Sequence, residues 1–313
     1  MGDKPEILVV GPYPDWDLAP MDEAYRLRRL WEAPDRDAFL RDCADVRAIA
    51  TRGELGASGA LMKALPRLEI VACYGVGTDA IDLEAARAGG IRVTNTPGVL
   101  TEDVADMAIA LTLATMRRVT AAEAHVRSGR WADGTFELVR RFHGCKLGIA
   151  GYGRIGAAVA KRAAGFDVEI AYFDKVAPPG IDHRRFDTLV DLAAWCDVLV
   201  VTLAGGPGMG RIVDARVLEA LGPEGFLVNV SRGMIVDEPA LLDILERRGI
   251  AGAGLDVFLG EPRIDPRFAT LENVVLQPHH SSGTVETRRA MGQLVRDNLA
   301  AHFAGLPLPT PVI

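Results

Sequence analysis

Four polar side chains in the last third of the chain have the chemistry of a carbonyl-reducing site. Arg232, Asp256, Glu261 and His279 each come shortly after an apolar run that reads as a buried strand. An arginine offers a planar fork that grips a carboxylate and polarises a neighbouring carbonyl. A histidine can give a proton to a carbonyl oxygen, and a glutamate beside it orients the ring and favours its charged form. Together with a hydride donor, this set fits reduction of a 2-keto acid, or oxidation of a 2-hydroxy acid in reverse.

Each of these residues also has a plainer interpretation. Arg232 could form a surface ion pair, and Glu261 could be a solvated residue before a proline. Of two adjacent histidines we choose His279, which follows the proline directly, and we expect His280 to pack or cap. The remaining histidines show no constellation and are expected at the surface: His125, His143, His183 and His302.

A glycine-rich motif marks the place where we expect a hydride-donating cofactor to bind. Gly151, Gly153 and Gly156 form G-x-G-x-x-G between the apolar run 147–150 and a helix-forming segment that begins at Arg154. Strand, glycine turn and helix in this order are the context of a dinucleotide site. The first glycine allows the tight turn, the second lets backbone approach a pyrophosphate, and the third lets helix and strand pack closely. The helix N-terminus then offers N–H groups to the phosphates.

The next strand ends in an acidic residue, Asp174, about 20 residues beyond the motif, where the dinucleotide fingerprint has one. Such an aspartate can accept hydrogen bonds from both ribose hydroxyls and repel a 2′-phosphate. It could also be a solvated residue that opens a loop. Lys175 follows it and weakens the charge argument, so we expect NAD(H) to be preferred, with NADP(H) possible.

The elements that must position these residues alternate between strand and helix. We expect strands over 7–10, 46–50, 69–74, 91–95, 147–150, 168–173, 198–203, 226–230, 251–255 and 274–277, and helices over 21–30, 35–44, 58–65, 83–88, 154–164, 188–194, 214–221 and 237–247. This alternation favours parallel sheets with helices on both faces. Ligands of such sheets lie outside the carboxyl ends of the strands, so the polar residues can converge although far apart in sequence.

Two further helices organise the domains. A long helix over 102–127 could link two domains, and a last helix over 285–303 is expected to return to the first domain. We therefore expect a discontinuous substrate-binding domain, 1–98 with 288–313, and a dinucleotide-binding domain, 99–287. The segment 128–144 carries Trp131 and Phe142, which could pack on a partner subunit or within the chain.

Composition limits the class of protein. The chain has 313 residues, enough for two domains with full cores, and 25% charged residues, which is ordinary for a globular protein. A net charge of −7 with no basic tail argues against nucleic-acid binding. No apolar stretch is long enough for a membrane span, and the N-terminal apolar run, 7–10, is too short for a signal-peptide core. Four scattered cysteines without metal spacing indicate reduced packing residues, so we expect no metal and a cytoplasmic protein.

The chain resembles the D-isomer-specific 2-hydroxyacid dehydrogenase family, most of all its glyoxylate/hydroxypyruvate and hydroxyphenylpyruvate reductase branch. The resemblance runs from about Ala48 to Ile313. Its motifs are V-T-N-T-P-G-V-L-T at 93–101, D-V-A-D at 103–106, G-Y-G-R-I-G at 151–156, S-R-G at 231–233, G-A-G-L-D-V-F at 252–258, E-P at 261–262 and E-N-V-V-L-Q-P-H at 272–279. Motifs in this number and order are highly specific to the family.

The resemblance implies an α/β fold of two Rossmann-like, doubly wound domains with an active-site cleft between them, and a homodimer. It implies that Arg232 binds and polarises the substrate, that His279 donates the proton, and that Glu261 pairs with His279. Backbone N–H groups of Val76 and Gly77 would hold the substrate carboxylate, and Arg52 would face the substrate side chain. The remaining implied cofactor contacts are Arg154, Ile155, Thr202, Val230, Ser231, Asp256, His279 and Ser281.

Three functions stay open on the sequence. The first is reduction of glyoxylate, hydroxypyruvate or a larger 2-keto acid to the D-2-hydroxy acid. The second is a dinucleotide-sensing binding protein of the corepressor type, for which the chain shows no extra tail or insert. The third keeps the fold with the chemistry of the formate or phosphite dehydrogenase relatives. Formate dehydrogenase has glutamine where Glu261 stands, so this carboxylate favours a histidine that cycles a proton.

Overall fold

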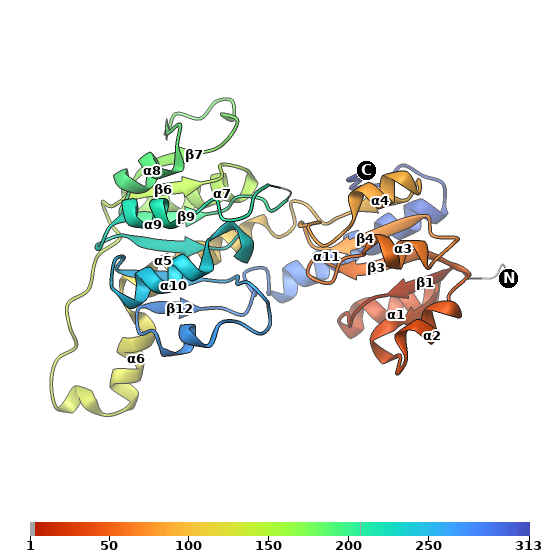
Figure 1. Cartoon of the computed structure of the whole chain (residues 1–313), viewed down its shortest axis with the longest axis horizontal. Coiled ribbons are helices and arrows are strands. Elements are labelled where there is room, and N and C mark those ends of the chain that lie inside the picture. The colour runs from red at the N-terminus through yellow and green to blue at the C-terminus, as the bar shows by residue number, and fades with distance from the viewer. Residues whose placement is uncertain (1–3, 207) are drawn as a thin grey trace. The chain divides into compact units, whose positions relative to one another are not determined.

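The computed structural model describes residues 4–206 and 208–313, which form two compact units. The first unit contains the described residues up to Leu100 together with Gly283–Ile313, and the second is Thr101–Ser282. The chain therefore enters the second unit once and returns to the first through its last helix (Figure 1). The domain boundaries expected from the sequence lie after residues 98 and 287, whereas the two compact units divide after Leu100 and Ser282. Within the described residues, no helix is both long and apolar enough to cross a membrane.

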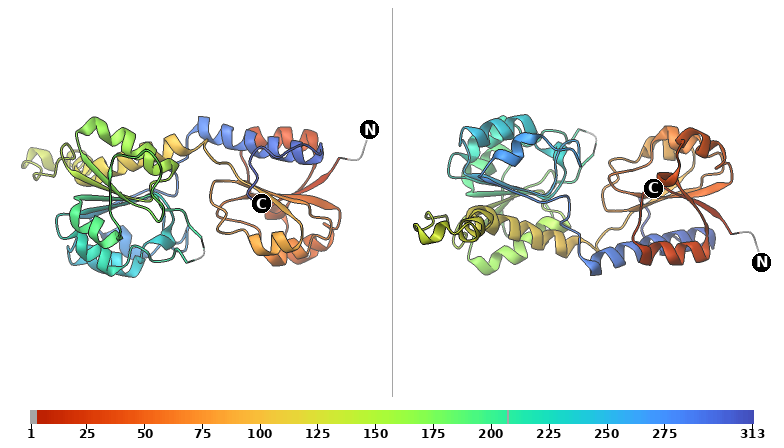
Figure 2. Two further views of the ribbon diagram at one scale, coloured as in Figure 1. Left: turned by 90° about the horizontal axis from the view of Figure 1, so that it is seen from above. Right: turned by 90° about the horizontal axis from the view of Figure 1, so that it is seen from below.

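The first unit is a five-stranded parallel sheet with the order β2-β1-β3-β4-β5. Its elements are β1 (Glu6–Val9), α1 (Asp15–Ala24), β2 (Arg26–Arg29), α2 (Arg36–Arg41), β3 (Val46–Arg52), α3 (Gly59–Lys63), β4 (Ile70–Tyr74), α4 (Leu83–Ala88), β5 (Arg92–Thr94) and α11 (Val285–Phe303). Helices α1 and α11 cover one face, and α2, α3 and α4 cover the other (Figure 2).

The second unit is a seven-stranded parallel sheet with the order β12-β11-β10-β9-β6-β7-β8. Its elements are α5 (Thr101–Met116), α6 (Val119–Arg127), β6 (Lys146–Ala150), α7 (Arg154–Ala163), β7 (Glu169–Phe173), β8 (Arg184–Arg185), α8 (Leu189–Trp195), β9 (Val198–Val201), α9 (Ala215–Leu221), β10 (Phe226–Asn229), α10 (Glu238–Glu246), β11 (Gly252–Leu255) and β12 (Val274–Leu276). The prediction of parallel α/β sheets is confirmed for both units.

The strand order of the second unit reverses beside β6. The chain runs outward through β7 and β8, crosses back to β9 on the other side of β6, and continues through β10 to β12. Such a reversal leaves a crevice at the carboxyl ends of the two central strands, which is where ligands of this fold bind. The glycine motif follows β6 directly, so it lies at this crevice.

Short polar residues start most of these helices. Ser58, Asp214, Asp237 and Thr284 each accept a hydrogen bond from the backbone N–H three residues later. These caps satisfy N–H groups that have no partner inside the helix. They fix the strand-to-helix turns at which the polar residues of the predicted site lie.

The expected helix over 21–30 is wrong. Helix α1 begins at Asp15, continues through Pro20 and ends at Ala24, and the arginine-rich segment that follows is the edge strand β2. Residues Arg26–Arg29 pair in parallel with Glu6–Val9 of β1. This pairing is a long-range contact, and it overrides the helical propensity of the local sequence.

The expected single helix over 102–127 is also wrong, because it is two helices. Helix α5 ends at Met116 and α6 begins at Val119. Between them Arg118 adopts a left-handed conformation with φ of 47°, which cannot continue a right-handed helix. The short strand β8 was not expected at all, since it is only Arg184–Arg185 on the edge of the sheet.

Candidate active site

The three glycines of the motif have different steric surroundings. Gly151 has φ of +97°, and a Cβ there would lie 2.8 Å from the Leu203 nitrogen. A Cβ at Gly156 would lie 2.2 Å from the Gly151 oxygen, so strand and helix meet with no room for a side chain. A Cβ at Gly153 would meet no described atom within 4 Å. The surface at Gly153 is therefore open, as a cradle for a phosphate must be.

The N-terminus of α7 faces the same open surface. Gly153 is its N-cap and has no side-chain capping bond, and Arg154, Ile155 and Gly156 are its first residues. Their N–H groups precede the first helical hydrogen bond, which Ala157 makes to the Gly153 oxygen at 2.9 Å. Unpaired N–H groups and the helix dipole together favour an anion at this end. The residues present thus fit the pyrophosphate of a dinucleotide.

Two polar side chains hold the glycine turn from the neighbouring strand ends. The Thr202 hydroxyl, just after β9, donates to the Gly151 oxygen at 2.6 Å. The Asp174 carboxylate, just after β7, accepts the Tyr152 N–H at 2.7 Å. Both residues therefore belong to the crevice, and Asp174 keeps lone pairs for a further hydrogen bond.

Two cationic residues lie near Asp174, one of them next to it in the sequence. The Arg185 guanidinium of β8 donates to the Asp174 backbone oxygen at 3.0 Å. Lys175 is exposed, and its Nζ lies 3.3 Å from the Met209 sulfur. A ribose hydroxyl at Asp174 would thus meet one carboxylate with positive side chains close by, a mixed electrostatic surface.

Arg232 is held by the loop after β10. The Asn229 side chain accepts the Ser231 N–H at 3.0 Å and the Ser231 hydroxyl at 2.7 Å, and it donates to the Arg232 oxygen at 3.1 Å. Val230 and Ser231 are buried, while the Arg232 side chain is half-buried. Asn229 was not predicted as a positioning residue, although its place at a strand end was a usable signal.

Glu261 and His279 form the closest contact between candidate catalytic residues. His279 Nδ1 lies 2.6 Å from Glu261 Oε2, and Glu261 Oε1 accepts the Phe258 N–H at 2.7 Å. Burial raises the pKa of Glu261, but the hydrogen bonds from His279 and Phe258 and the charges of His279 and Arg232 outweigh burial and lower it. Glu261 is therefore an ionised acceptor at neutral pH, so His279 carries a proton on Nδ1 and directs Nε2 elsewhere.

Asp256 fixes the backbone that carries His279. Its buried carboxylate accepts the N–H groups of His280 at 2.7 Å and Ser281 at 3.1 Å, and its backbone oxygen accepts the His279 N–H at 2.8 Å. His279 adopts a left-handed φ of 52° in this tight loop. Among the described residues, the buried Ser281 hydroxyl has no hydrogen-bond partner, which leaves it available to a ligand.

The first unit holds the other expected substrate contacts at the carboxyl ends of its own strands. Arg52 ends β3 and pairs with Glu54 at 2.6 Å, while Val76 and Gly77 follow β4. The Asn95 side chain donates to the Val76 oxygen at 2.8 Å. Because a peptide is planar and trans, this bond turns the Gly77 N–H to the opposite side. Asn95 is a second candidate positioning residue that was not predicted from the sequence.

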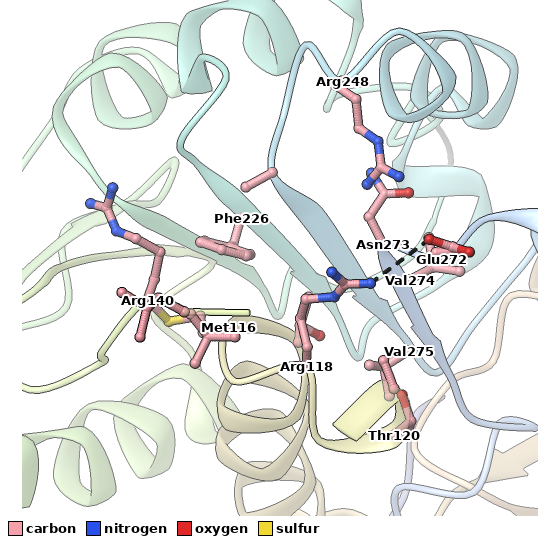
Figure 3. Close-up of a pocket in the computed structure, with 15 residues that line it drawn as sticks. Met116, Arg118, Thr120, Arg140, Phe226, Arg248, Glu272, Asn273, Val274 and Val275 are labelled. Atoms are coloured by element: carbon pink, nitrogen blue, oxygen red, sulfur yellow. Dashed lines mark ion pairs between the residues drawn. The ribbon is translucent and has the colours of Figure 1, made fainter. Parts of the chain in front are cut away.

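A separate cavity lies at the opposite, amino-terminal edge of the second unit's sheet (Figure 3). It has a volume of about 190 Å³ and is lined by the end of α5, Leu138 and Arg140 of the following segment, and the starts of β10 and β12. Arg118 reaches across it to Glu272, at 3.9 Å. Three buried atoms of lining residues have no hydrogen-bond partner among the described residues: Thr115 Oγ1, Arg118 Nε and Asn273 Oδ1.

The structure corrects the expectation for one histidine and decides between the two alternatives left open for Phe142. His302 is buried, not at the surface, and its ring contacts Glu69 at 2.9 Å and the Arg92 guanidinium. Phe142 is buried against Phe166 of its own unit, so it does not face a partner, whereas Trp131 is exposed. The other residues predicted to bind cofactor or substrate lie at or just after the carboxyl ends of strands, or at the start of α7. No metal-binding group of three or more ligands occurs in residues 4–206 and 208–313.

Comparison with known proteins assigns the chain to a family. Residues 109–281 match the family model described as the NAD-binding domain of D-isomer-specific 2-hydroxyacid dehydrogenases. The chain is 44% identical to hydroxyphenylpyruvate reductase of Plectranthus scutellarioides, over 98% of both chains, and 45% identical to 2-ketogluconate reductase of Gluconobacter oxydans, over 100% of both.

The solved structures agree with the sequence comparison. The crystal structure of an NADPH-dependent glyoxylate/hydroxypyruvate reductase from Sinorhizobium meliloti, in complex with NADP and malonate, superposes with a TM-score of 0.94. The match has 44% identity and covers 99% of this chain and 97% of that one. The resemblance inferred from the motifs is thereby confirmed. The chain belongs to the D-isomer-specific 2-hydroxyacid dehydrogenase family and is an NAD(P)-dependent oxidoreductase.

Proposed function

We propose that this chain reduces a 2-keto acid to the D-2-hydroxy acid, with His279 as the proton donor. The observation that carries the proposal is the 2.6 Å contact between His279 Nδ1 and Glu261 Oε2, on the sheet whose glycine turn fits a dinucleotide. A reduced nicotinamide, when bound, supplies the hydride. The chain's own residues then have to bind the acid, polarise the carbonyl and deliver one proton.

His279 can deliver that proton from Nε2. Glu261 accepts from Nδ1, which fixes the ring and stabilises the charged imidazolium before transfer. Proton loss from Nε2 leaves a neutral ring that still donates from Nδ1 to Glu261. Arg232 offers the paired N–H groups that a carboxylate and its neighbouring carbonyl oxygen accept.

Uncharged backbone N–H groups after β4 are proposed to bind the substrate carboxylate. We assign this role to the N–H groups of Val76 and Gly77, whose orientation is supported by the bond from Asn95 to the Val76 oxygen. Consecutive backbone N–H groups in a glycine-containing turn favour an anion. Arg52, at the end of β3, is proposed to face the variable end of the substrate.

The cofactor is proposed to be NADH in preference to NADPH. Asp174 lies at the glycine turn, where a carboxylate accepts from ribose hydroxyls and repels a 2′-phosphate. Arg185 and Lys175 lie close by, so we expect NADPH to be used as well. The Sinorhizobium relative is described as NADPH-dependent, which supports this tolerance.

The substrate is proposed to be hydroxypyruvate, glyoxylate or a larger 2-keto acid. The relatives are named for hydroxyphenylpyruvate, for 2-ketogluconate and for glyoxylate with hydroxypyruvate. These names share a 2-keto acid head and differ in the side chain beyond it. This supports the common head as the group that Arg232 and His279 recognise.

The active form is proposed to be a homodimer that covers the segment around α6. Val119, Val126, Trp131 and Leu138 expose large apolar side chains there. The cavity of Figure 3 adjoins this segment, because Leu138 is one of its lining residues.

Initial rates of cofactor oxidation test the proposal. We expect turnover of hydroxypyruvate, glyoxylate or phenylpyruvate with NADH ahead of NADPH. Removing a general acid typically costs roughly a hundredfold to ten-thousandfold in rate, so His279→Ala should lose at least about a hundredfold in kcat. His280→Ala is the matched control, because that adjacent ring makes no contact with Glu261. Wild-type turnover in His279→Ala would overturn the proton-donor role.

A further inference from the structure

A second buried carboxylate holds the loop that carries Glu261. Glu238, the first residue of α10, is 8% exposed, and its Oε2 accepts the Leu259 N–H at 2.8 Å. Glu261 accepts the N–H of the preceding residue, Phe258, at 2.7 Å. Two successive peptide N–H groups are thus held by two different acids. The Phe258–Leu259 peptide therefore cannot turn without breaking the hydrogen bond to Glu238, and the Val257–Phe258 peptide before it is held in the same way by Glu261.

The same peptide also lies against the loop of Arg232. A Cβ at Gly233 would lie 2.1 Å from the Phe258 carbonyl carbon and oxygen, and 2.7 Å from the Leu259 nitrogen. Only a glycine lets the two backbones approach this closely. Movement of the Phe258–Leu259 peptide would therefore displace Glu261 on one side and the Arg232 loop on the other.

Stability alone does not call for an acid at position 238. Burial raises the pKa of Glu238, as do the charges of Asp265 and Glu261, while the Leu259 N–H and Arg267 lower it. A buried charged group is costly to desolvate, and an apolar side chain of similar size is often tolerated as well or better. What an apolar residue could not do is accept the Leu259 N–H.

We propose that Glu238 is a positioning residue of the reductase site: by accepting the Leu259 N–H it fixes the Phe258–Leu259 peptide, and through it the carboxylate of Glu261 that orients His279. This inference rests on the proposed function, because it assigns Glu238 to the same reaction. Glu238 touches neither the imidazole nor any reacting atom, so its effect is transmitted through Glu261.

Substitutions at Glu238 test this role. Glu238→Leu removes the acceptor, and we expect kcat to fall at least tenfold while KM for NADH stays within twofold. Glu238→Gln keeps an acceptor oxygen and should stay within threefold of wild type. Glu238→Asp keeps the charge but shortens the reach, so it should fall in the same direction as Glu238→Leu and serves if that variant does not fold. Glu246→Leu, at the exposed end of the same helix, is the matched control.

Coupling to Glu261 separates positioning from general destabilisation. In a Glu261→Gln background, whose dyad is already impaired, adding Glu238→Leu should cost less than twofold in kcat. An undiminished tenfold loss there would overturn the proposal, as would a Glu238→Leu enzyme within twofold of wild type. Glu238→Gln as impaired as Glu238→Leu would also overturn it, since the acceptor would then be irrelevant.

A readout without substrate keeps the test valid if no keto acid is turned over. Diethylpyrocarbonate acylates a free ring nitrogen of imidazole, and Glu261 engages Nδ1 of His279 at 2.6 Å, so a displaced Glu261 would leave that ring more open to the reagent. We expect modification at His279, mapped by peptide mass spectrometry, to be at least threefold faster in Glu238→Leu and Glu238→Asp than in wild type or Glu246→Leu. Absent turnover with this acceleration would contradict the proposed function alone, whereas equal modification rates would contradict the role of Glu238.

Discussion

At the scale of single residues, Glu261 links the chemistry of the site to its stability. Its two oxygens accept from His279 and from the Phe258 N–H, so one carboxylate fixes both a side chain and a peptide. The carboxylate can do this only while it is ionised. Its lowered pKa keeps it ionised at neutral pH, despite burial that acts in the opposite direction.

This lowered pKa predicts how the stability of the protein depends on pH. The pKa of Glu261 is near 4.5 in the unfolded chain, and its pKa in the folded protein lies below that. The stability contributed by ionised Glu261 is therefore fully present above pH 4.5 and is lost as the pH falls through the folded pKa. We expect wild type to have a higher urea midpoint than Glu261→Gln at about pH 5, and the gap to shrink towards about pH 3. A gap that stayed constant or widened on acidification would contradict this assignment.

The candidate catalytic residues could be predicted from sequence, but Glu238 and Asn95, which we propose to position them, could not. Arg232, Glu261 and His279 follow apolar runs, and the carboxyl ends of parallel strands meet at one edge of a sheet. Glu238 and Asn95 act through hydrogen bonds to backbone atoms of distant segments, for which composition and spacing carry no signal. The buried partners of His302 are long-range contacts of the same kind.

At the scale of elements, the unit formed by β6, the glycine turn and α7 is where we propose that the pyrophosphate of the cofactor binds. Its second and third glycines differ in what surrounds them. Gly156 is closed by the Gly151 oxygen, whereas Gly153 faces open space. The close contact at Gly156 maintains the packing of α7 on β6, and the open surface at Gly153 is free for a ligand. Steric demands of folding and of binding are thus carried by different residues of one motif.

A pair of alanine substitutions separates these two demands. Gly156→Ala places a Cβ 2.2 Å from a backbone oxygen, and overpacking of this kind costs about 1–3 kcal/mol. It should lower Tm by several degrees and weaken NADH binding. Gly153→Ala meets no described atom within 4 Å, so its Tm should stay near that of wild type while Kd for NADH rises at least tenfold. Unchanged NADH affinity in Gly153→Ala would show that the pyrophosphate does not approach this glycine.

Errors in the predicted elements occurred where tertiary contacts decide. The helix expected over 21–30 fails because Arg26–Arg29 pairs with β1, a contact invisible in a local window. The break between α5 and α6 occurs at Arg118, which is neither glycine nor proline and so gives no local warning. By contrast, α11 was expected over 285–303, and the structure has it as Val285–Phe303, with its start capped by Thr284.

At the scale of the whole molecule, two parallel α/β units with different strand orders are built from one alternating pattern. The first unit reverses direction between β1 and β3, and the second between β6 and β9. Each therefore has its polar residues at the carboxyl ends of central strands. Sequence periodicity is sufficient for this architecture, whereas the family motifs were needed to assign a substrate-binding role to Val76 and Gly77.

The exposed segment around α6 predicts the assembly of the molecule. Val119 and Val126 lie seven residues apart on one face of α6, and beyond the helix Leu138 is 99% exposed. Large apolar side chains that gather on one surface usually mark an interface. We expect wild type to sediment as a dimer and Leu138→Glu to shift the equilibrium strongly towards monomer.

The control for this substitution is Leu306→Glu, whose side chain is 58% exposed and belongs to the other compact unit. It should leave the dimer intact, because an exposed leucine outside an interface contributes little to association. Leu138→Glu should not change the free energy of unfolding of the single chain, because the Leu138 side chain is already in solvent there. Any loss of dimer without a change in Tm of the monomeric species therefore reports the contact itself. A wild-type monomer, or a Leu138→Glu protein that stays fully dimeric, would place the interface elsewhere or remove it.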